Sequence, residues 1–427
     1  TCTAFLSLCL LLGSTSLALA QSDEDPSDSG SDLDLELPDL SSQPSDSWSD
    51  SYEEEVEKET EAVETPSAQN LVPMTTRVFV DGFYMVDWND PKQSDAASSL
   101  PHRAYDFTEG FALAFAGIDV DYQQEAVGLT LDLRFGKGAN RYLGQDDPVL
   151  ATLKQAYGTW KPMPALTLDL GQFDTIYGGE VTDSWPNLNY SRGALYYLQP
   201  FYHTGLRATY NHDDQISITA IAVNGTNALP VDNNETPHVG AQIGLSPMPG
   251  LTVALGYYTG AQSSGYGKGK APAGKNEEEW IRSDSGWEQM GDLVLTYQMD
   301  ALKVVANGTF IRNGQSGDDC LTLDKKTVCG ASDFWGASLA AGYSVASDLQ
   351  VALRGEYILD GNQYITDTYD ELRTATATLD YRPVSNVVLR LEHRVEMADE
   401  EIYATNDSAE KMWQATTLSM VVATSTE

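Results

Sequence analysis

Long apolar runs are absent from this 427-residue sequence after its first 20 residues. A helix needs about 20 consecutive apolar residues to cross the hydrocarbon core of a membrane. The sequence therefore argues against an α-helical membrane protein. It leaves membrane insertion open, because the strands of a membrane β-barrel alternate and are only half apolar.

Basic residues are also scarce. Lys and Arg total 25 against 63 Asp and Glu, so the formal net charge is −38. This balance argues against nucleic acid as a partner. Much of the charge is local, since the segment Ser22–Pro66 holds 17 acidic residues and a single basic residue, Lys58.

Residues that carry chemistry are few, with five histidines and four cysteines. The sequence has neither the Gly-x-Ser-x-Gly elbow of hydrolases nor the His-Glu-x-x-His motif of zinc proteases. The cluster His212-Asp213-Asp214 falls in a predicted short turn, where an aspartate commonly binds its own backbone. We therefore expect no catalytic site, no metal site and no cofactor.

Composition divides the chain into three segments. Residues 1–20 are predicted to be a cleaved signal peptide that lacks its charged start, with an apolar core at Phe5–Gly13 and a small-x-small site at Ala18–Ala20. Residues 21–72 are acidic and poor in aromatics, so we expect a disordered segment, either a solvated spacer or a periplasmic tether or plug. Residues 73–427 form the third segment.

Apolar and polar residues alternate throughout this third segment, in runs of about 8–14 residues that are typical of strands. Short turns and long polar loops separate the runs in strict alternation. This asymmetry predicts an all-β, antiparallel, up-and-down transmembrane β-barrel of about 16 strands, with short periplasmic turns and long extracellular loops. The runs are Val78–Val86, Gly110–Tyr122, Leu129–Phe135, Ala151–Trp160, Leu166–Gly171, Gly205–Tyr210, Ile216–Val223, Val239–Leu245, Leu251–Tyr258, Leu293–Met299, Leu302–Ile311, Trp335–Val345, Leu349–Leu359, Arg373–Tyr381, Val387–Val395 and Met412–Val422.

One stretch also carries a family resemblance. It contains a Gly-Gln-Phe strand end, a Gly-Glu loop, an Asn-x-Asn-Tyr-Ser-Arg segment and a Pro-Phe-x-His-Thr-Gly restart. These elements are Gly171–Phe173, Gly179–Glu180, Asn187–Arg192 and Pro200–Gly205. The pattern resembles the OmpL-like family of β-barrel porins from Gram-negative outer membranes. The resemblance implies pore formation in the bacterial outer membrane and no catalytic residues.

The charged face of the predicted strands points to either of two structures. In a soluble sandwich it would meet water, whereas in a membrane barrel it would line the lumen, because a charge facing lipid costs about 2–4 kcal/mol at mid-depth. Export, loop asymmetry and strand number favour the barrel, and sixteen strands enclose an aqueous channel. The predicted pore-lining residues are Asp132, Arg134, Arg207, Lys303, Arg354, Glu356, Arg390, Glu392 and Arg394.

The long loop Gly178–Tyr202 is the candidate constriction. If it folds inward, Glu180 and Asp183 would face Arg192 and the lumenal arginines, which would give a transverse field as well as a size limit. The alternative is an external loop packed at the rim.

Cysteine positions fit an exported protein. Cys2 and Cys9 lie in the predicted leader, and Cys320 and Cys329 lie nine residues apart in a polar stretch. That spacing predicts a local disulfide in an oxidising compartment, with two free thiols as the alternative.

The predicted function is passive diffusion of small hydrophilic solutes or ions through an outer-membrane porin. The predicted partners are outer-membrane lipids and the solutes themselves, and either a monomer or a homo-oligomer fits the sequence. A non-conducting structural or adhesive barrel is the alternative, and an outer-membrane enzyme is a more distant one. The chain ends at Thr426-Glu427 rather than at the aromatic residue that usually ends such barrels.

Overall fold

The computed structural model describes residues 73–91, 100, 102–103, 109–143, 152–227, 237–263, 285–314, 320–323, 326–329, 332–361, 365–366 and 368–426. The expected signal peptide, residues 1–20, and the expected acidic segment, residues 21–72, lie outside these residues.

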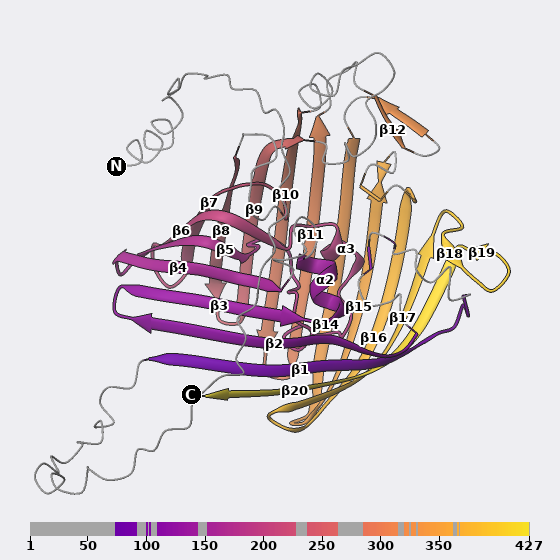
Figure 1. Ribbon diagram of the computed structural model, residues 1–427, viewed down its shortest axis with the longest axis horizontal. Helices are drawn as coiled ribbons and strands as arrows, with labels where there is room; N and C mark the ends of the chain where they lie inside the picture. The colour runs from indigo at the N-terminus through magenta and orange to yellow at the C-terminus, as the bar shows by residue number, and fades with distance from the viewer. Residues whose placement is uncertain are drawn as a thin grey trace, which may run out of the picture. The chain divides into compact units, whose positions relative to one another are not determined.

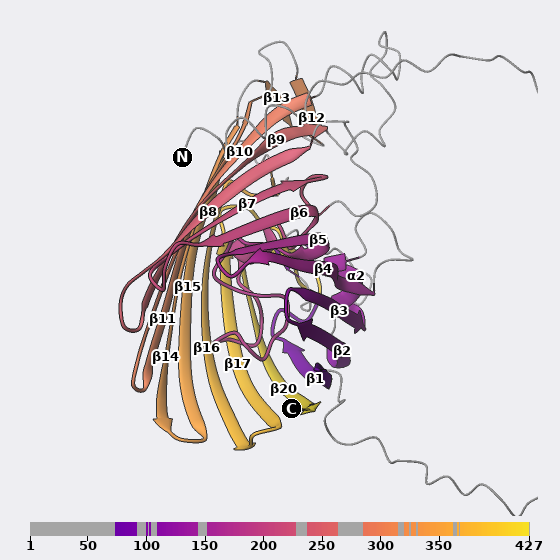
Figure 2. The same cartoon turned by 90° about the vertical axis from the view of Figure 1, so that its left-hand side faces the viewer.

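Sixteen antiparallel strands close into one barrel, and the first strand pairs with the last. The strands follow one another around the wall in chain order (Figures 1 and 2). Each predicted run falls on one of them, so the all-β up-and-down barrel is confirmed. The strands are β1 (Met74–Asp87), β2 (Gly110–Gln124), β3 (Val127–Phe135), β4 (Leu153–Met163), β5 (Leu166–Asp174), β6 (Tyr202–Asn211), β7 (Ile216–Val223), β8 (His238–Met248), β9 (Leu251–Ser263), β10 (Ser285–Met299), β11 (Leu302–Gly314), β14 (Ser332–Ala346), β15 (Leu349–Asp360), β16 (Glu371–Val384), β17 (Val387–Ala398) and β20 (Met412–Thr426).

The two ends of the barrel differ in their connections. At one end, turns of two to four residues join successive strands, and at the other end the connections run from 10 to 27 residues. The turn between β10 and β11 places Asp300 at φ 51°, a left-handed conformation that Asp tolerates better than most residues. Two small hairpins lie within the long connections, β12 (Cys320–Leu323) with β13 (Lys326–Cys329), and β18 (Tyr403–Ala404) with β19 (Ala409–Glu410).

The strands separate two kinds of side chain. On β15, Leu353 is 60% exposed on the outside of the wall, while its neighbour Arg354 is 2% exposed on the inside, because successive side chains of a strand point to opposite faces. The outer face is apolar over most strands and the inner face carries the charges. Among the described residues, no helix is long and apolar enough to cross a membrane. The two described helices are α2 (Lys137–Leu143) and α3 (Ala194–Tyr197).

Two paired glycines lie where β5 and β6 lead into their long connection. Gly171 and Gly205 lie opposite each other in the ladder. Gly171 has φ 138°, which is strained for any residue with a side chain, and a Cβ there would lie 2.8 Å from the Cα of Tyr157. Beyond Gly171 the alternation breaks, since Gln172 and Phe173 are both buried. The glycines of the sequence motif therefore mark the point where the side-chain alternation of β5 breaks, while its pairing with β6 continues to Asp174 and Tyr202.

Candidate functional site

Residues 175–201, which join β5 to β6 and contain α3, lie against the inner wall of the barrel and are called the inward loop below. Figure 1 shows α3 beside the wall formed by β14 and β15. Side chains of the loop that are at most 1% exposed include Asn189, Tyr190 and Arg192. The loop is therefore packed like the interior of a globular protein rather than lying on a surface.

The predicted loop carboxylates each meet a cation of the wall. Asp183 accepts hydrogen bonds from Nε and Nη2 of Arg134, both at 2.9 Å, and from Nζ of Lys154 at 3.1 Å. Burial alone would raise the pKa of Asp183, but the Lys154 and Arg134 charges hold it well below its usual value. Glu180 accepts a hydrogen bond from Nη1 of Arg354 at 2.8 Å.

The third predicted loop residue, Arg192, is fully buried, and its Nε donates to the hydroxyl of Tyr142 at 3.2 Å. Tyr142 belongs to α2, so a second long connection also reaches the loop. The structure thus brings Glu180 and Asp183 to lumenal cations, while Arg192 lies among aromatic side chains.

Wall carboxylates hold the backbone of the loop. Glu392 of β17 accepts the N–H groups of Tyr190 and Ser191 at 2.6 and 3.0 Å. Glu356 of β15 accepts those of Ala194 and Leu195 at 3.0 and 3.1 Å. These four N–H groups lie outside the strand ladders. The two carboxylates therefore accept hydrogen bonds from backbone donors that would otherwise be buried and unsatisfied.

Wall arginines hold the carbonyl groups of the same loop. Arg390 donates to the carbonyl oxygens of Ser184 at 2.6 Å and Asn187 at 2.9 Å, and its Nε donates to Asp380 at 2.8 Å. Arg394 donates to the carbonyl oxygen of Arg192 at 3.0 Å. Charged groups of β15–β17 therefore bind the loop through its backbone and not mainly through its side chains.

Two further strands bind the loop from other directions. Asp81 of β1 accepts hydrogen bonds from the hydroxyls of Ser184 at 2.5 Å and Tyr190 at 2.9 Å. Asp292 of β10 accepts them from the Gly178 N–H at 2.9 Å and from Nε2 of Gln199 at 2.8 Å. The loop is thus bound from several sides of the ring of strands.

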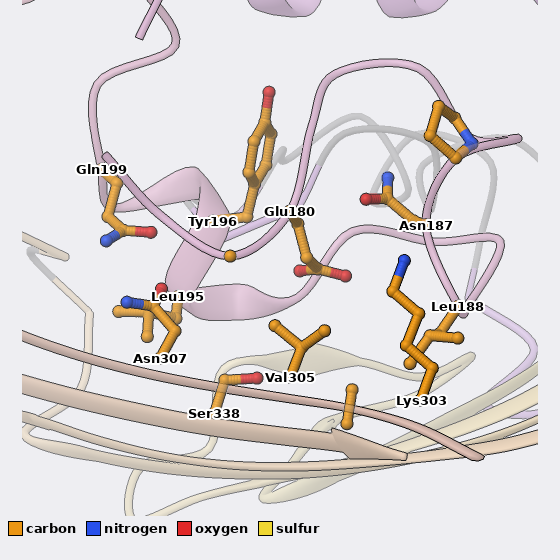
Figure 3. A pocket seen from close by; sticks show the side chains of 13 residues that line it. Glu180, Asn187, Leu188, Leu195, Tyr196, Gln199, Lys303, Val305, Asn307 and Ser338 are labelled. Atoms are coloured by element: carbon orange, nitrogen blue, oxygen red, sulfur yellow. The ribbon is translucent and has the colours of Figure 1, made fainter. Parts of the chain in front are cut away.

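The remaining predicted pore-lining residues are also on the inner face. Arg207 pairs with Asp169 at 2.9 Å, and Asp132 accepts a hydrogen bond from Gln155 at 2.6 Å. Lys303 is half-buried and, within the described part of the chain, makes no ion pair. It lines a gap between the inward loop and the wall of β11 and β14, where Figure 3 shows its amine pointing toward the loop near Asn187.

Sequence reasoning missed an apolar belt near the long-loop end of the inner wall. Its members are neighbours in the strand registers and are at most 7% exposed: Tyr258, Met290, Ile311 and Phe334 on β9–β14, and Ile358, Leu372 and Ala398 on β15–β17. Apolar side chains of the inward loop belong to the same buried cluster. The alternation of β15 does contain the signal, since Ile358 continues the inward series of Arg354 and Glu356.

Sequence reasoning also missed a polar cluster around Glu396 of β17. Its Oε2 atom lies 3.0 Å from Nε2 of His102, 2.8 Å from Nη2 of Arg103 and 3.0 Å from the hydroxyl of Tyr403. Burial lowers the pKa of His102, although the Glu396 charge opposes this. The cluster joins two long connections that are far apart in the sequence, which no local pattern indicates.

The other predicted positions have plainer surroundings. In the turn between β6 and β7, Asp213 accepts the N–H groups of Gln215 and Ile216, both at 2.8 Å, so the predicted turn role of this aspartate is confirmed. Within the described residues, no group of three or more His, Cys, Asp or Glu could hold a metal ion. The backbones of Cys320 and Cys329 lie opposite each other in the β12–β13 hairpin, while their side chains lie outside the described part.

Known proteins share this architecture. Residues 73–425 match the family described as "Putative beta-barrel porin-2, OmpL-like". The anion-selective porin from Comamonas acidovorans is similar at 10% identity with a TM-score of 0.52, over 82% of this chain and 99% of that one. OmpF of Salmonella typhi in complex with daunomycin is similar at 13% identity with a TM-score of 0.51, over 82% of this chain and 97% of that one. The trimer form of OmpT of Vibrio cholerae is similar at 11% identity with a TM-score of 0.50, over 83% of this chain and 99% of that one. No curated protein matches the sequence.

Proposed function

Since the chain belongs to the OmpL-like β-barrel porin-2 family, we propose that it forms a pore in the bacterial outer membrane through which small hydrophilic solutes or ions diffuse passively. The proposal assigns it no catalytic step and no cofactor. The mature protein would reach the membrane through a cleaved signal peptide, and its short turns would face the periplasm.

One observation carries the proposal: a closed wall of sixteen strands has apolar residues on its outer face and charged residues on its inner face. A closed barrel leaves no strand edge unpaired, which is what a strand-built structure needs in lipid. Sixteen strands also enclose a space wide enough for water. The predicted pore-lining residues line this space in the proposal, and the inward loop narrows it.

A homo-oligomer and a disulfide complete the proposal. The Vibrio cholerae OmpT structure is described as a trimer, and we extend an oligomeric state of that kind to this chain. The opposed backbones of Cys320 and Cys329 favour a disulfide that closes the β12–β13 hairpin. Alkylation of the two thiols only after reduction, and chemical crosslinking in detergent, would test the two parts separately.

A non-conducting barrel is the second candidate, and the contacts of the inward loop favour it. Hydrogen bonds from β1, β10, β15 and β17 reach the loop, and apolar residues bury it further. Such a loop is a plug if the space around it is too small for an ion.

Single-channel recording of the refolded mature protein in a planar bilayer distinguishes the two candidates. Stable conductance steps are expected for the pore. A protein that inserts, has β-rich circular dichroism and never conducts would contradict the diffusion pore and favour the plugged barrel.

A further inference from the structure

Two of the gaps between the inward loop and the inner wall differ in chemistry. One lies between the loop and β11 and β14, with a volume of about 40 Å³ counted as the space that centres of water molecules can occupy. On that measure one water needs about 10–15 Å³, so a few waters fit. The other lies on the β1 and β17 side, with about 20 Å³ and mostly aromatic and aliphatic neighbours.

Charge distinguishes the gap along β11 and β14 further. Five of the six predicted pore-lining cations have a carboxylate within 4.0 Å: Arg134, Arg207, Arg354, Arg390 and Arg394. Lys303 has none among the described residues, and it lines this gap. In Figure 3 its amine points from the wall into the gap, toward Asn187 of the loop.

The carboxylates near the gap are already engaged. Glu180 accepts the Arg354 guanidinium at 2.8 Å and the Gly193 N–H at 2.6 Å. Asp292 is 2% exposed, and its oxygens accept donors from both loop and wall, including Asn307 at 2.8 Å. An ion in the gap would therefore meet an unpaired ammonium group on one side and a compensated carboxylate on the other.

We propose that solutes pass the inward loop through this gap along β11 and β14, and that Lys303 gives the passage a preference for small anions. The proposal rests on the pore function proposed above and adds the route and the preferred charge. The neighbouring wall allows a route here because its inward residues are small: Ser338, Ala340 and Gly342 of β14.

The charge test uses Lys303→Gln, Lys303→Glu and the control Lys161→Gln, with reversal potentials measured for the full mature protein in a potassium chloride gradient. Lys161 lies near the short-turn end of β4, is half-buried like Lys303 and has no ion pair among the described residues. We expect the wild type to prefer chloride, Lys303→Gln to lower the chloride-to-potassium permeability ratio about fivefold, and Lys303→Glu to invert the preference. Lys161→Gln should leave the ratio nearly unchanged.

The route test uses two adjacent cysteine substitutions on β14. Ser338 lines the gap, while Ala337 is exposed on the outer face of the same strand. A bulky anionic thiol reagent should reduce the conductance of Ser338→Cys and leave that of Ala337→Cys unchanged. If all variants conduct and neither Lys303 substitution nor Ser338 modification alters the current, the route and its charge preference are wrong while the pore remains. If no variant conducts, the proposed pore function fails and this inference fails with it.

Discussion

The two walls that flank the inward loop hold it by different means. Along β15–β17, buried charges bind its backbone, as Glu392 binds two N–H groups and Arg390 binds carbonyl groups. Along β14 the loop meets the small residues Gly336, Ser338 and Ala340, and Leu195 packs beside Gly336. The charged wall can fix the path of the loop largely independently of its side chains, whereas the small-residue wall leaves space for water. In the proposed pore, one kind of surface holds the loop and the other kind borders the route of the solute.

Removing the loop should abolish the difference between the walls and give the largest effect. Replacing residues 179–199 with a short Gly-Ser linker removes the main contents of the mid-lumen, so the conductance should rise severalfold, since a sixteen-strand barrel encloses an aqueous channel. Bilayer recording measures this. Shortening the connection that holds the β18–β19 hairpin is the control and should change the conductance much less. Unchanged conductance after removal of the loop would mean that the loop does not limit the current.

Breaking the charged wall should release the loop without emptying the lumen. Arg390→Met removes the donor to several loop carbonyls, while Asp380 keeps its bond from Nε of Arg382 at 2.9 Å. A buried hydrogen bond to a charged donor contributes about 1.5–3 kcal/mol to the unfolding free energy, so the loss of the bonds to the Ser184 and Asn187 carbonyls should cost about 3–6 kcal/mol. Urea unfolding from lipid vesicles measures this value. Arg373→Met is the control, because Arg373 is 59% exposed in its pair with Glu371 and such pairs contribute about 0–1 kcal/mol. Equal losses in the two variants would contradict the role of Arg390.

Crowding the small-residue wall should have a smaller effect. In Gly336→Val the new Cβ would overlap Cδ1 of Leu195, which must move away. Overpacking of this kind costs about 1–3 kcal/mol, and we expect the same urea experiment to give a value below that of Arg390→Met. Gly355→Val is the matched control, since nothing lies within 4 Å of a Cβ there. A loss for Gly355→Val as large as that for Gly336→Val would show that the strand backbone, not the loop contact, is responsible.

Acid should weaken the loop's attachment to β3 and β4, and of the predicted effects this one should be the smallest. Because Lys154 and Arg134 lower the pKa of Asp183 in the folded protein, the stabilisation is complete above the unfolded value of about 3.9. Below that pH the unfolded state binds the proton first, so the stabilisation declines as the pH falls toward the folded pKa. The difference in unfolding free energy between wild type and Asp183→Asn should therefore be constant from about pH 7 to 5 and shrink below about pH 4. Asp214→Asn in the β6–β7 turn is the control, and a constant difference down to the lowest pH would contradict the linkage.

Strand positions and faces were predictable because each depends on a local period of two. Leu391 and Glu392 already alternate in the sequence, and they do lie on opposite faces of β17. What binds the carboxylate of Glu392 was not predictable, because its partners are backbone N–H groups about 200 residues away, and every residue except proline has one. The charges of Glu180 and Asp183 suggested lumenal arginines as partners, but the route of the loop depends on tertiary contacts such as that of Arg390. The apolar belt was overlooked because polar residues dominate the same inner face closer to the middle of the strands.

The inward loop also bridges the seam of the barrel. β1 and β20 meet there, and the loop binds Asp81 on β1 and Glu392 on β17, one on each side of β20. The loop can make both sets of contacts only when the first strand and the last strands stand next to each other. Complete docking of the loop therefore requires joined chain ends, and the two hydrogen bonds of Tyr190, one to Asp81 and one to Glu392, are present together only in a closed barrel.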